Sequence, residues 1–501
     1  MFYPSDKTMN EFRALWHRSG GESDPIDNSV YSIQRPGGQF GKHTNLAQYN
    51  YSDRFQFIDN FNIFLGNHTI KAGAEYMYVP SGVSVFDLLI PGLYVFTMDR
   101  PFDANDPTTY PLLFIYNQGD PAFDLPYHVF APYVQDSWRI HPRLTLNFGI
   151  RWNYYDCIGL DEDNFNIKHF NPRFGFSWDP VGDGRTQIRG GLGTYTANMN
   201  SNPAFPFVFY SDVQQTNIYY PGYPDPSKPN PFAPAVEIAA TVAEYVETSV
   251  VAPWTFQATL GVNREIITDF SVSADLVYSR GYNMIHWENY NPIIVGTQYV
   301  HEDPARGDVW SPVNQGKSDY KALYLTFNKR YSHGWAFEAS YTLSKSMGNT
   351  EDDTNRPWSY EDDVWERAYG RTNTDSRHKI TFAGTVDLPL GFQVSGIVYY
   401  QSAPPWNAVY TYDFNKDGLT NDYVDFHRNS RQGFDAFFIN ARLSWYINID
   451  RFRFQVFGEF YNLTNRNNFF DVYPYEGTDG FGEPISAMDP RLIQIGGRID
   501  F

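Results

Sequence analysis

The sequence predicts an all-β fold, an antiparallel transmembrane outer-membrane β-barrel. Three observations favour it. Aromatic residues make up 18% of the 501 residues, although the mean hydropathy is -0.48. Apolar and polar residues alternate in strand-length segments, and short turns alternate with long loops. An aromatic-rich chain that is polar on average is typical of strands with one apolar and one polar face.

The alternation is clearest in the middle and C-terminal parts of the chain. Leu144 to Tyr154 places large apolar side chains on one face and Thr, Asn, Gly and Arg on the other. The same period of two marks 270–279, 335–343, 439–447 and 452–460. We expect fifteen strands from Asp53–Leu65 to Arg491–Phe501, with Tyr31–Phe40 as a sixteenth.

The connections between these segments are of two kinds. Tight turns join strands in pairs, as at Gly66-Asn67, Pro142-Arg143 and His333-Gly334. Every second connection is long, and the long ones run roughly over 81–126, 156–169, 197–251, 282–317, 347–377, 403–434 and 464–489. Strands that run up and down place all short turns at one end and all long loops at the other, as periplasmic turns and extracellular loops are placed in outer-membrane barrels.

Two soluble all-β folds are weaker alternatives. A propeller would repeat every 40–50 residues or so with a blade signature, and the sequence shows no such repeat. A β-sandwich would not need a series of long loops at one end, so it does not account for the positions of the long connections.

Composition excludes several function classes. Lys and Arg number 38 against 57 Asp and Glu, a formal net charge of -19, which argues against a nucleic-acid partner. Cys157 is the single cysteine, so neither an internal disulfide framework nor a multi-cysteine metal site is expected. No nucleophile elbow, phosphate loop or HExxH helix occurs, which argues against an enzyme. The first residues lack the pattern of a signal peptide, so we expect either a protein that is not exported or a chain that is not the whole precursor.

A series of short motifs, by their order and spacing together, resembles the barrel of TonB-dependent receptors, the Oar-like group above all. The motifs are Tyr133-Val134-Gln135-Asp136-Ser137-Trp138, Asn171-Pro172-Arg173-Phe174-Gly175-Phe176, Tyr278-Ser279-Arg280-Gly281, Phe327-Asn328-Lys329-Arg330, Asp375-Ser376-Arg377-His378 and Phe460-Tyr461-Asn462-Leu463-Thr464-Asn465. The resemblance covers about residues 45–501.

The resemblance implies a barrel of 22 strands, an N-terminal plug domain and a TonB box. The sequence shows neither plug nor TonB box, so we expect a C-terminal barrel portion, with residues 1–30 as an undefined segment and residues 31–501 as the barrel. The implied partners are the TonB system, the plug, outer-membrane lipid and the barrel-assembly machinery, with surface proteins as further candidates. The implied location is the outer membrane of a Gram-negative-type bacterium.

One loop motif indicates a calcium site. Asp413, Asn415, Asp417, Asn421 and Asp422 follow the spacing of oxygen ligands around Ca²⁺, with Gly418 at the bend. The glutamate expected at the twelfth position is replaced by Val424. A solvated, Asx-rich turn is the alternative interpretation.

The last strand resembles the signal that barrel-assembly machinery recognises. Its key residues are Gln494, Gly496, Ile499 and Phe501, and we expect Ile499 and Phe501 to face lipid and Asp500 the lumen. Charges are also expected on the lumen face, at Arg151, Asp275, Glu338, Arg453, Glu459 and Arg498. Such charges require water or a polar plug beside them.

Two functions are compatible with these features. The first is a plugged receptor that imports an unidentified ligand by TonB-dependent transport. The second is a structural or adhesive barrel, or a passive porin, that acts through its surface loops.

Overall fold

The computed structural model describes residues 2–120, 122–157, 167–196, 213–239, 244–245, 251–295, 298–303, 308–350, 368–415, 422–425 and 427–501. The main sheet holds 20 strands, of which β9 (Ala122–Phe123), β16 (Glu244–Tyr245) and β23 (Gly370–Arg371) are two-residue strands at its margin. The other strands follow one another in antiparallel order. They are β1 (Phe2–Ser5), β2 (Thr8–Ser23), β5 (Gln48–Leu65), β6 (His68–Phe86), β10 (Tyr127–His141), β11 (Leu144–Cys157), β12 (Ile167–Trp178), β13 (Thr186–Thr196), β17 (Trp254–Ile267), β18 (Phe270–Asn289), β21 (Val309–Ser332), β22 (Trp335–Gly348), β24 (His378–Asp387), β25 (Phe392–Gln401), β28 (Ala436–Ile449), β29 (Phe452–Tyr461) and β32 (Leu492–Asp500).

The all-β class and the fifteen strands predicted from Asp53 onward are confirmed, as β5 to β32 of the main sheet. The predicted sixteenth strand at Tyr31–Phe40 is wrong. Ser32–Arg35 and Gly38–Gly41 form β3 and β4 of a separate small sheet, and β2 pairs with β5 instead. The barrel sheet therefore begins within the segment left undefined at residues 1–30. β2 was missed because its Gly20-Gly21 and several polar residues interrupt the alternation.

The strand register gathers the alternating side chains on two faces. One apolar row crosses β17, β18, β21 and β22, where each strand contributes a leucine that pairs with the leucine of the next strand. These residues are Leu260, Leu276, Leu323 and Leu343. The residues next to these leucines form a second row on the opposite, polar face. They are Gly261, Asp275, Tyr324 and Thr342. A register slip of one residue would exchange these faces, so the alternation fixes the pairing.

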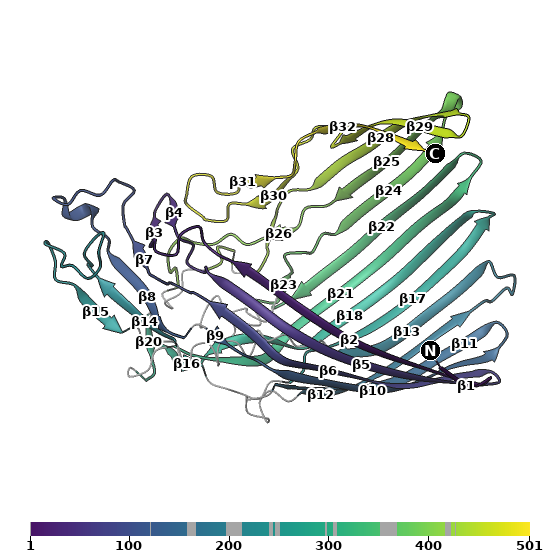
Figure 1. Ribbon diagram of the computed structural model, residues 1–501, viewed down its shortest axis with the longest axis horizontal. Helices are drawn as coiled ribbons and strands as arrows, with labels where there is room; N and C mark the ends of the chain where they lie inside the picture. The colour runs from purple at the N-terminus through teal and green to yellow at the C-terminus, as the bar shows by residue number, and fades with distance from the viewer. Residues whose placement is uncertain are drawn as a thin grey trace.

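Turn residues close the strand pairs at one end of the sheet. His333 and Gly334 have φ angles of 56° and 80°, and Leu390 and Gly391 have 65° and 82°. Two consecutive positive φ angles are the geometry of turns that match the twist of a hairpin. Both chain termini lie at this short-turn end (Figure 1).

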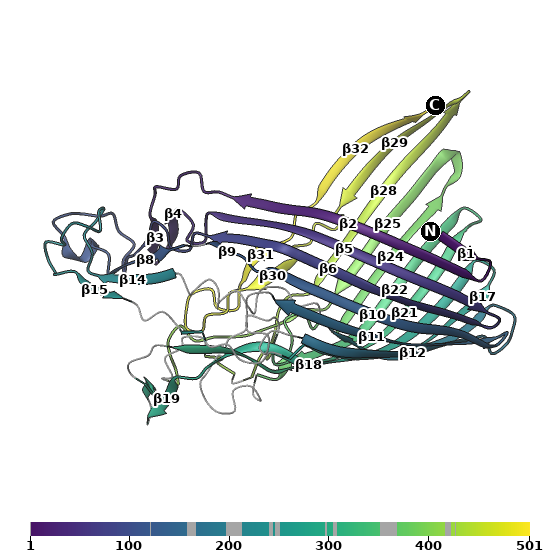
Figure 2. The same cartoon turned by 60° about the horizontal axis from the view of Figure 1, so that its bottom comes forward.

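The long connections carry a second, six-stranded sheet at the other end (Figures 1 and 2). Its order is β15 (Val236–Ala239), β14 (Val213–Tyr219), β8 (Leu113–Gly119), β7 (Leu93–Val95), β3 and β4. Tyr94, Phe96 and Phe114 form its buried core, and burial raises the pKa of Tyr94. Smaller elements are β19 (Pro292–Val295) with β20 (Gln298–His301), β26 (Pro405–Trp406) with β27 (Arg431–Gln432), β30 (Phe469–Val472) with β31 (Pro484–Ala487), and the 3-10 turns η1 (Pro107–Thr109) and η2 (Pro389–Gly391).

The main sheet has two edges. Within the described ranges, β1 pairs only with β2, β32 pairs only with β29, and no pair joins the two ends of the sheet. Figure 2 shows the first and last strands diverging toward the short-turn end. In the same ranges no helix is long and apolar enough to cross a membrane.

Candidate functional site

Long polar side chains on the polar face connect strands that are not direct neighbours. Arg189 on β13 donates from Nη2 to both carboxylate oxygens of Asp275 on β18, at 2.7 and 2.9 Å. The pair crosses β17 above Gly261, which is the register partner of both residues. A Cβ atom at Gly261 would lie 1.9 Å from Asp275 Oδ1, so glycine leaves the space that the pair occupies.

A similar arrangement occurs nearer the N-terminus. Arg151 Nη2 on β11 donates to Glu75 Oε2 on β6 at 2.5 Å, across β10. The Tyr133 hydroxyl on β10 donates to Asn60 Oδ1 on β5, across Gly73 of β6. These residues line a polar hollow of about 620 Å³ on the polar face. Arg189 and Arg151 are thus held by partners two strands away, and such charges require water or a polar domain beside the wall.

The predicted polar-face charges have different surroundings. Arg442 Nη1 donates to Glu459 Oε1 at 3.1 Å on neighbouring strands. Arg453 lies 4.4 Å from the centroid of the Tyr446 ring, and Arg498 Nε donates to Asp500 Oδ1 at 2.7 Å. Glu338 is exposed on β22 opposite Asn328. The alternation of apolar and polar residues in the sequence therefore predicts the face on which these side chains lie, but it does not predict their interaction partners.

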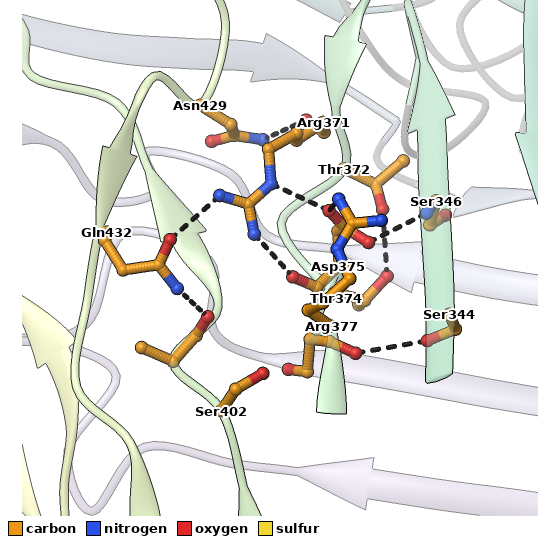
Figure 3. A network of polar contacts seen from close by, with 12 residues as sticks. Ser344, Ser346, Arg371, Thr372, Thr374, Asp375, Arg377, Ser402, Asn429 and Gln432 are labelled. Carbon is orange, nitrogen blue, oxygen red and sulfur yellow. Dashed lines mark hydrogen bonds and ion pairs between the residues drawn. The ribbon is translucent and has the colours of Figure 1, made fainter. Parts of the chain in front are cut away.

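A buried polar network lies where the long loops meet β22 (Figure 3). The Asp375 side chain is fully buried, and both carboxylate oxygens are hydrogen-bonded. Arg371 Nε donates to Oδ2 at 2.7 Å, and the backbone N–H of Ser346 donates to Oδ1 at 2.8 Å. Arg371 Nη1 also donates to Gln432 Oε1 of β27 at 2.9 Å. Asp375 and Arg371 together thus connect the loop before β24 and the loop before β28 to β22.

Part of the predicted calcium motif lies within the described residues. The Asp422 side chain is buried and accepts a hydrogen bond from the backbone N–H of Phe414 at 2.7 Å, which closes the loop beside Asp413 and Asn415. Asp417 and Asn421 lie outside the described residues. The described residues contain no group of three His, Cys, Asp or Glu arranged to hold a metal ion.

An ion pair follows this motif in the same loop. Arg431 Nε donates to Asp425 Oδ2 at 2.7 Å, and the Ser430 hydroxyl donates to the same oxygen at 2.7 Å. The hydrogen bond from Arg431 is the main reason that the pKa of Asp425 lies below its usual value, and it raises the pKa of Arg431. Sequence reasoning missed this pair, because only the fold brings β27 beside the end of the loop.

The predicted assembly residues lie on β32 or, for Phe501, directly after it, at the C-terminal edge of the sheet. Ile499 pairs with Phe454 on the apolar face, and Gln494 pairs with Glu459 on the polar face. A Cβ atom at Gly496 would lie 2.4 Å from Cζ of Phe457, so the aromatic ring covers this glycine. Phe501 is 96% exposed.

An antiparallel sheet with one apolar and one polar face, short turns at one end and long loops at the other defines the wall of a membrane β-barrel. Comparison with known proteins supports this class. A family profile described as "Outer membrane beta barrel domain" matches residues 5–168 and 159–437. The chain belongs to this family, and it is a protein of the outer membrane.

Solved structures with the same fold are transporters and receptors of the outer membrane. The outer membrane transporter YddB from Escherichia coli has a TM-score of 0.65 at 13% identity, over 99% of this chain and 61% of that chain. The siderophore receptor PiuA from Acinetobacter baumannii has a TM-score of 0.56 at 12% identity, over 99% and 63%. FpvA of P. aeruginosa, bound to pyoverdines, has a TM-score of 0.57 at 11% identity, over 98% and 54%.

The chain thus spans less than two thirds of the length of these structures. At 11–13% sequence identity, the structural similarity establishes the fold alone. No curated protein matches the sequence. The narrower resemblance to the Oar-like group stays a prediction.

Proposed function

We propose that this chain forms the barrel wall of a TonB-dependent outer-membrane receptor, which imports a ligand past a plug domain in its lumen. The observation that carries the proposal is the polar face, where Arg189–Asp275 and Arg151–Glu75 form ion pairs across an intervening strand, the first of them above Gly261. Charged pairs of this kind can contact a polar plug and would be costly in a dry cavity.

The edges of the sheet support a larger wall. Each unsatisfied backbone group in hydrocarbon costs several kcal/mol, so an open strand edge is not stable within a membrane. β1 and β32 are such edges in this chain. We therefore propose that further strands lie between β1 and β32 in the assembled barrel and that the plug fills the space they enclose.

The alternative is a structural or adhesive barrel, and one observation favours it. The six-stranded sheet with its Tyr94 core extends the loop end of the wall as a folded unit, which could bind a surface partner. One structure of the same fold, with a TM-score of 0.56, is FpvAI in complex with pyocin S2. Neither alternative involves catalysis, and the transported ligand is not assigned.

Ion conductance distinguishes a plugged receptor from an open pore. The full-length protein, purified from outer membranes, is inserted into planar lipid bilayers, and copurification with the periplasmic domain of TonB is measured in parallel. A plugged receptor gives no steady conductance at rest and retains TonB. A steady open-pore current without TonB retention would establish a porin, whereas a closed barrel without TonB retention would favour the adhesive role.

A further inference from the structure

The apolar face of the main sheet carries an exposed cationic patch near the loop end. We define it as Lys321 on β21, Lys345 on β22 and Arg377 just before β24. Lys321 and Lys345 are direct partners in the β21–β22 register. They lie one position beyond Leu323 and Leu343 of the apolar row, on the same face, because side chains two residues apart point the same way.

The height of the patch places it at the outer membrane surface. Lys345 comes ten residues after Trp335, which begins β22 at the short-turn end. At about 3.3 Å per residue and a strand tilt of about 40°, this is about 25 Å above the turns. The apolar band of outer-membrane barrels is itself about 25 Å tall, so the patch lies where hydrocarbon gives way to lipid headgroups.

Aromatic pairs on either side of this level support the placement. Trp254 stacks on Tyr282 with ring centroids 4.4 Å apart, and Tyr341 stacks on His378 at 6.1 Å. Both pairs lie on the apolar face, Trp254–Tyr282 on the loop side of Lys321 and Tyr341 four residues before Lys345 on β22. Aromatic girdles mark membrane interfaces in such barrels.

The two lysines lack an anionic partner. Opposed residues in antiparallel strands have Cβ atoms about 5 Å apart, and like charges in this position destabilise the sheet. Within the described residues no carboxylate lies within ion-pair distance of Lys321 or Lys345, and both are exposed. In a chain with a net charge of -19, such a pair is not explained by general basicity.

Among the described residues, the acid beside the patch on this face is Asp319, and it has other partners. Asp319 accepts hydrogen bonds from the Tyr369 hydroxyl at 2.7 Å and the Tyr278 hydroxyl at 3.2 Å, and Arg280 lies 3.9 Å away. Arg377 adds a third positive charge, with its Nη2 atom 3.9 Å from the buried Asp375. A phosphate group placed between the two ammonium groups would offset their repulsion.

An apolar groove runs directly below the charges. It has a volume of about 560 Å³ and is lined by Leu260, Leu276, Leu323 and Leu343, with Lys321, Lys345 and Arg377 at its rim. Charge and groove together fit one chemical class, a lipid with an anionic headgroup and acyl chains. We propose that this surface binds a phosphorylated glycolipid of the outer leaflet, with phosphate at the lysine pair and an acyl chain along the leucines.

Lipid binding to the purified full-length protein tests the proposal. Native mass spectrometry would count bound diphosphoryl lipid A, and enzymatically dephosphorylated lipid A would be the comparison. The variant is Lys321→Gln with Lys345→Gln. The matched control is Lys7→Gln with Lys379→Gln, which removes the same charge from a short turn and from the polar face.

Wild type and control should bind diphosphoryl lipid A equally, and the variant should bind it at least ten times more weakly. All three should bind the dephosphorylated lipid weakly. Equal binding by the variant, or equal binding of both lipids by the wild type, would overturn the proposal. Displacement of the lipid by 10 mM inorganic phosphate would instead assign the patch to free phosphate. Heat-dependent gel mobility verifies that each variant is folded.

Discussion

Arg189 and Asp275 form an ion pair that crosses a strand belonging to neither of them. The guanidinium reaches Asp275 from β13 over β17, with Nη2 2.7 Å from Oδ1, and the strand between contributes Gly261 at the crossing point. Such a pair ties three strands together on the polar face. It also explains a glycine in the middle of a strand, where this residue is usually unfavourable.

The first prediction concerns this crossing. Gly261→Ala should break the pair, because its Cβ atom would lie 1.9 Å from Asp275 Oδ1. We expect a loss of about 1 kcal/mol in the free energy of unfolding in urea, since the pair is partly exposed to solvent. Gly458→Ala is the matched control, because its nearest neighbour would be 3.6 Å away. A Gly261→Ala variant as stable as the wild type would show that the pair contributes nothing.

The second prediction concerns the buried Asp375. Asp375→Ala removes the acceptor of Arg371 and of the Ser346 N–H, and it leaves a partly buried guanidinium without its carboxylate. Breaking a buried pair costs about 3–5 kcal/mol. We expect the loops to detach locally from β22, with much faster proteolysis near residues 368–377 and little change in the barrel strands. Asp479→Ala, at an exposed loop position, should keep the wild-type proteolysis pattern.

Most of the sheet could be predicted because alternation and turn chemistry act within a few residues. Leu144–Tyr154 and Phe452–Val456 alternate without interruption, and the register follows once one face must be apolar. β2 could not be predicted, because Gly20-Gly21, Leu15 on the polar face and Arg18 on the apolar face break the pattern. Its place is fixed by pairing with β5 from Thr8↔Ile63 to Ser23↔Gln48.

The site was less predictable, because its contacts join residues far apart in the sequence. Arg189 and Asp275 are 86 residues apart, and Arg371 and Gln432 are 61 apart. Single-sequence patterns indicate the face on which a charge lies but not the charge opposite. Likewise Lys321 and Lys345 become a pair only through the β21–β22 register.

The third prediction is a pH dependence at Asp425. Its pKa is lowered in the folded protein, chiefly by the hydrogen bond from Arg431. The stabilisation is therefore complete above the ordinary value of 3.8 and is lost as the pH falls through the lower folded pKa. Trp406, whose ring lies 5.8 Å from Arg431, reports on the loop.

The difference between the fluorescence of the wild type and that of Trp406→Phe should stay constant at higher pH and should change mainly below pH 3.8, the ordinary pKa value of the carboxyl group. In an Asp425→Asn background the same difference should be flat, because the titrating group is gone. A titration of equal size in that background would assign the transition to other carboxyl groups. Asp479→Asn serves as the background control.

The fourth prediction concerns calcium. We propose that Asp413, Asn415, Asp417, Asn421 and Asp422 bind one Ca²⁺ in the extracellular loop. The bond from the Phe414 N–H to Asp422, which brings the ends of the loop together, supports the proposal. Isothermal titration should show one Ca²⁺ bound per chain, and Asp413→Asn with Asp417→Asn should abolish the binding heat. Equal heats from the wild type and this variant would contradict the site, and Asp471→Asn with Asp479→Asn controls for lost surface charge.

The last prediction concerns assembly of the barrel. The edge strand β32 carries Gln494, Gly496 and Ile499, and Phe501 follows its last residue. The outer side of β32 pairs with no other described strand. An unpaired edge can bind another protein by strand addition, which is what assembly machinery requires before the barrel closes. Phe501 is 96% exposed and therefore contributes little to packing in the folded sheet. Loss of this residue should act on recognition rather than on stability.

Deletion of Phe501 and Phe501→Ala should each lower the amount of protein in the outer membrane several-fold, as measured by immunoblot of membrane fractions. The protein that does assemble should unfold in urea like the wild type. Leu390→Ala is the matched control, because Leu390 is an apolar residue, 87% exposed, in a short turn at the same end of the sheet. Its level should equal that of the wild type. Wild-type levels after deletion of Phe501 would show that β32 is recognised through other residues, whereas equal losses in both variants would reflect exposed apolar surface in general.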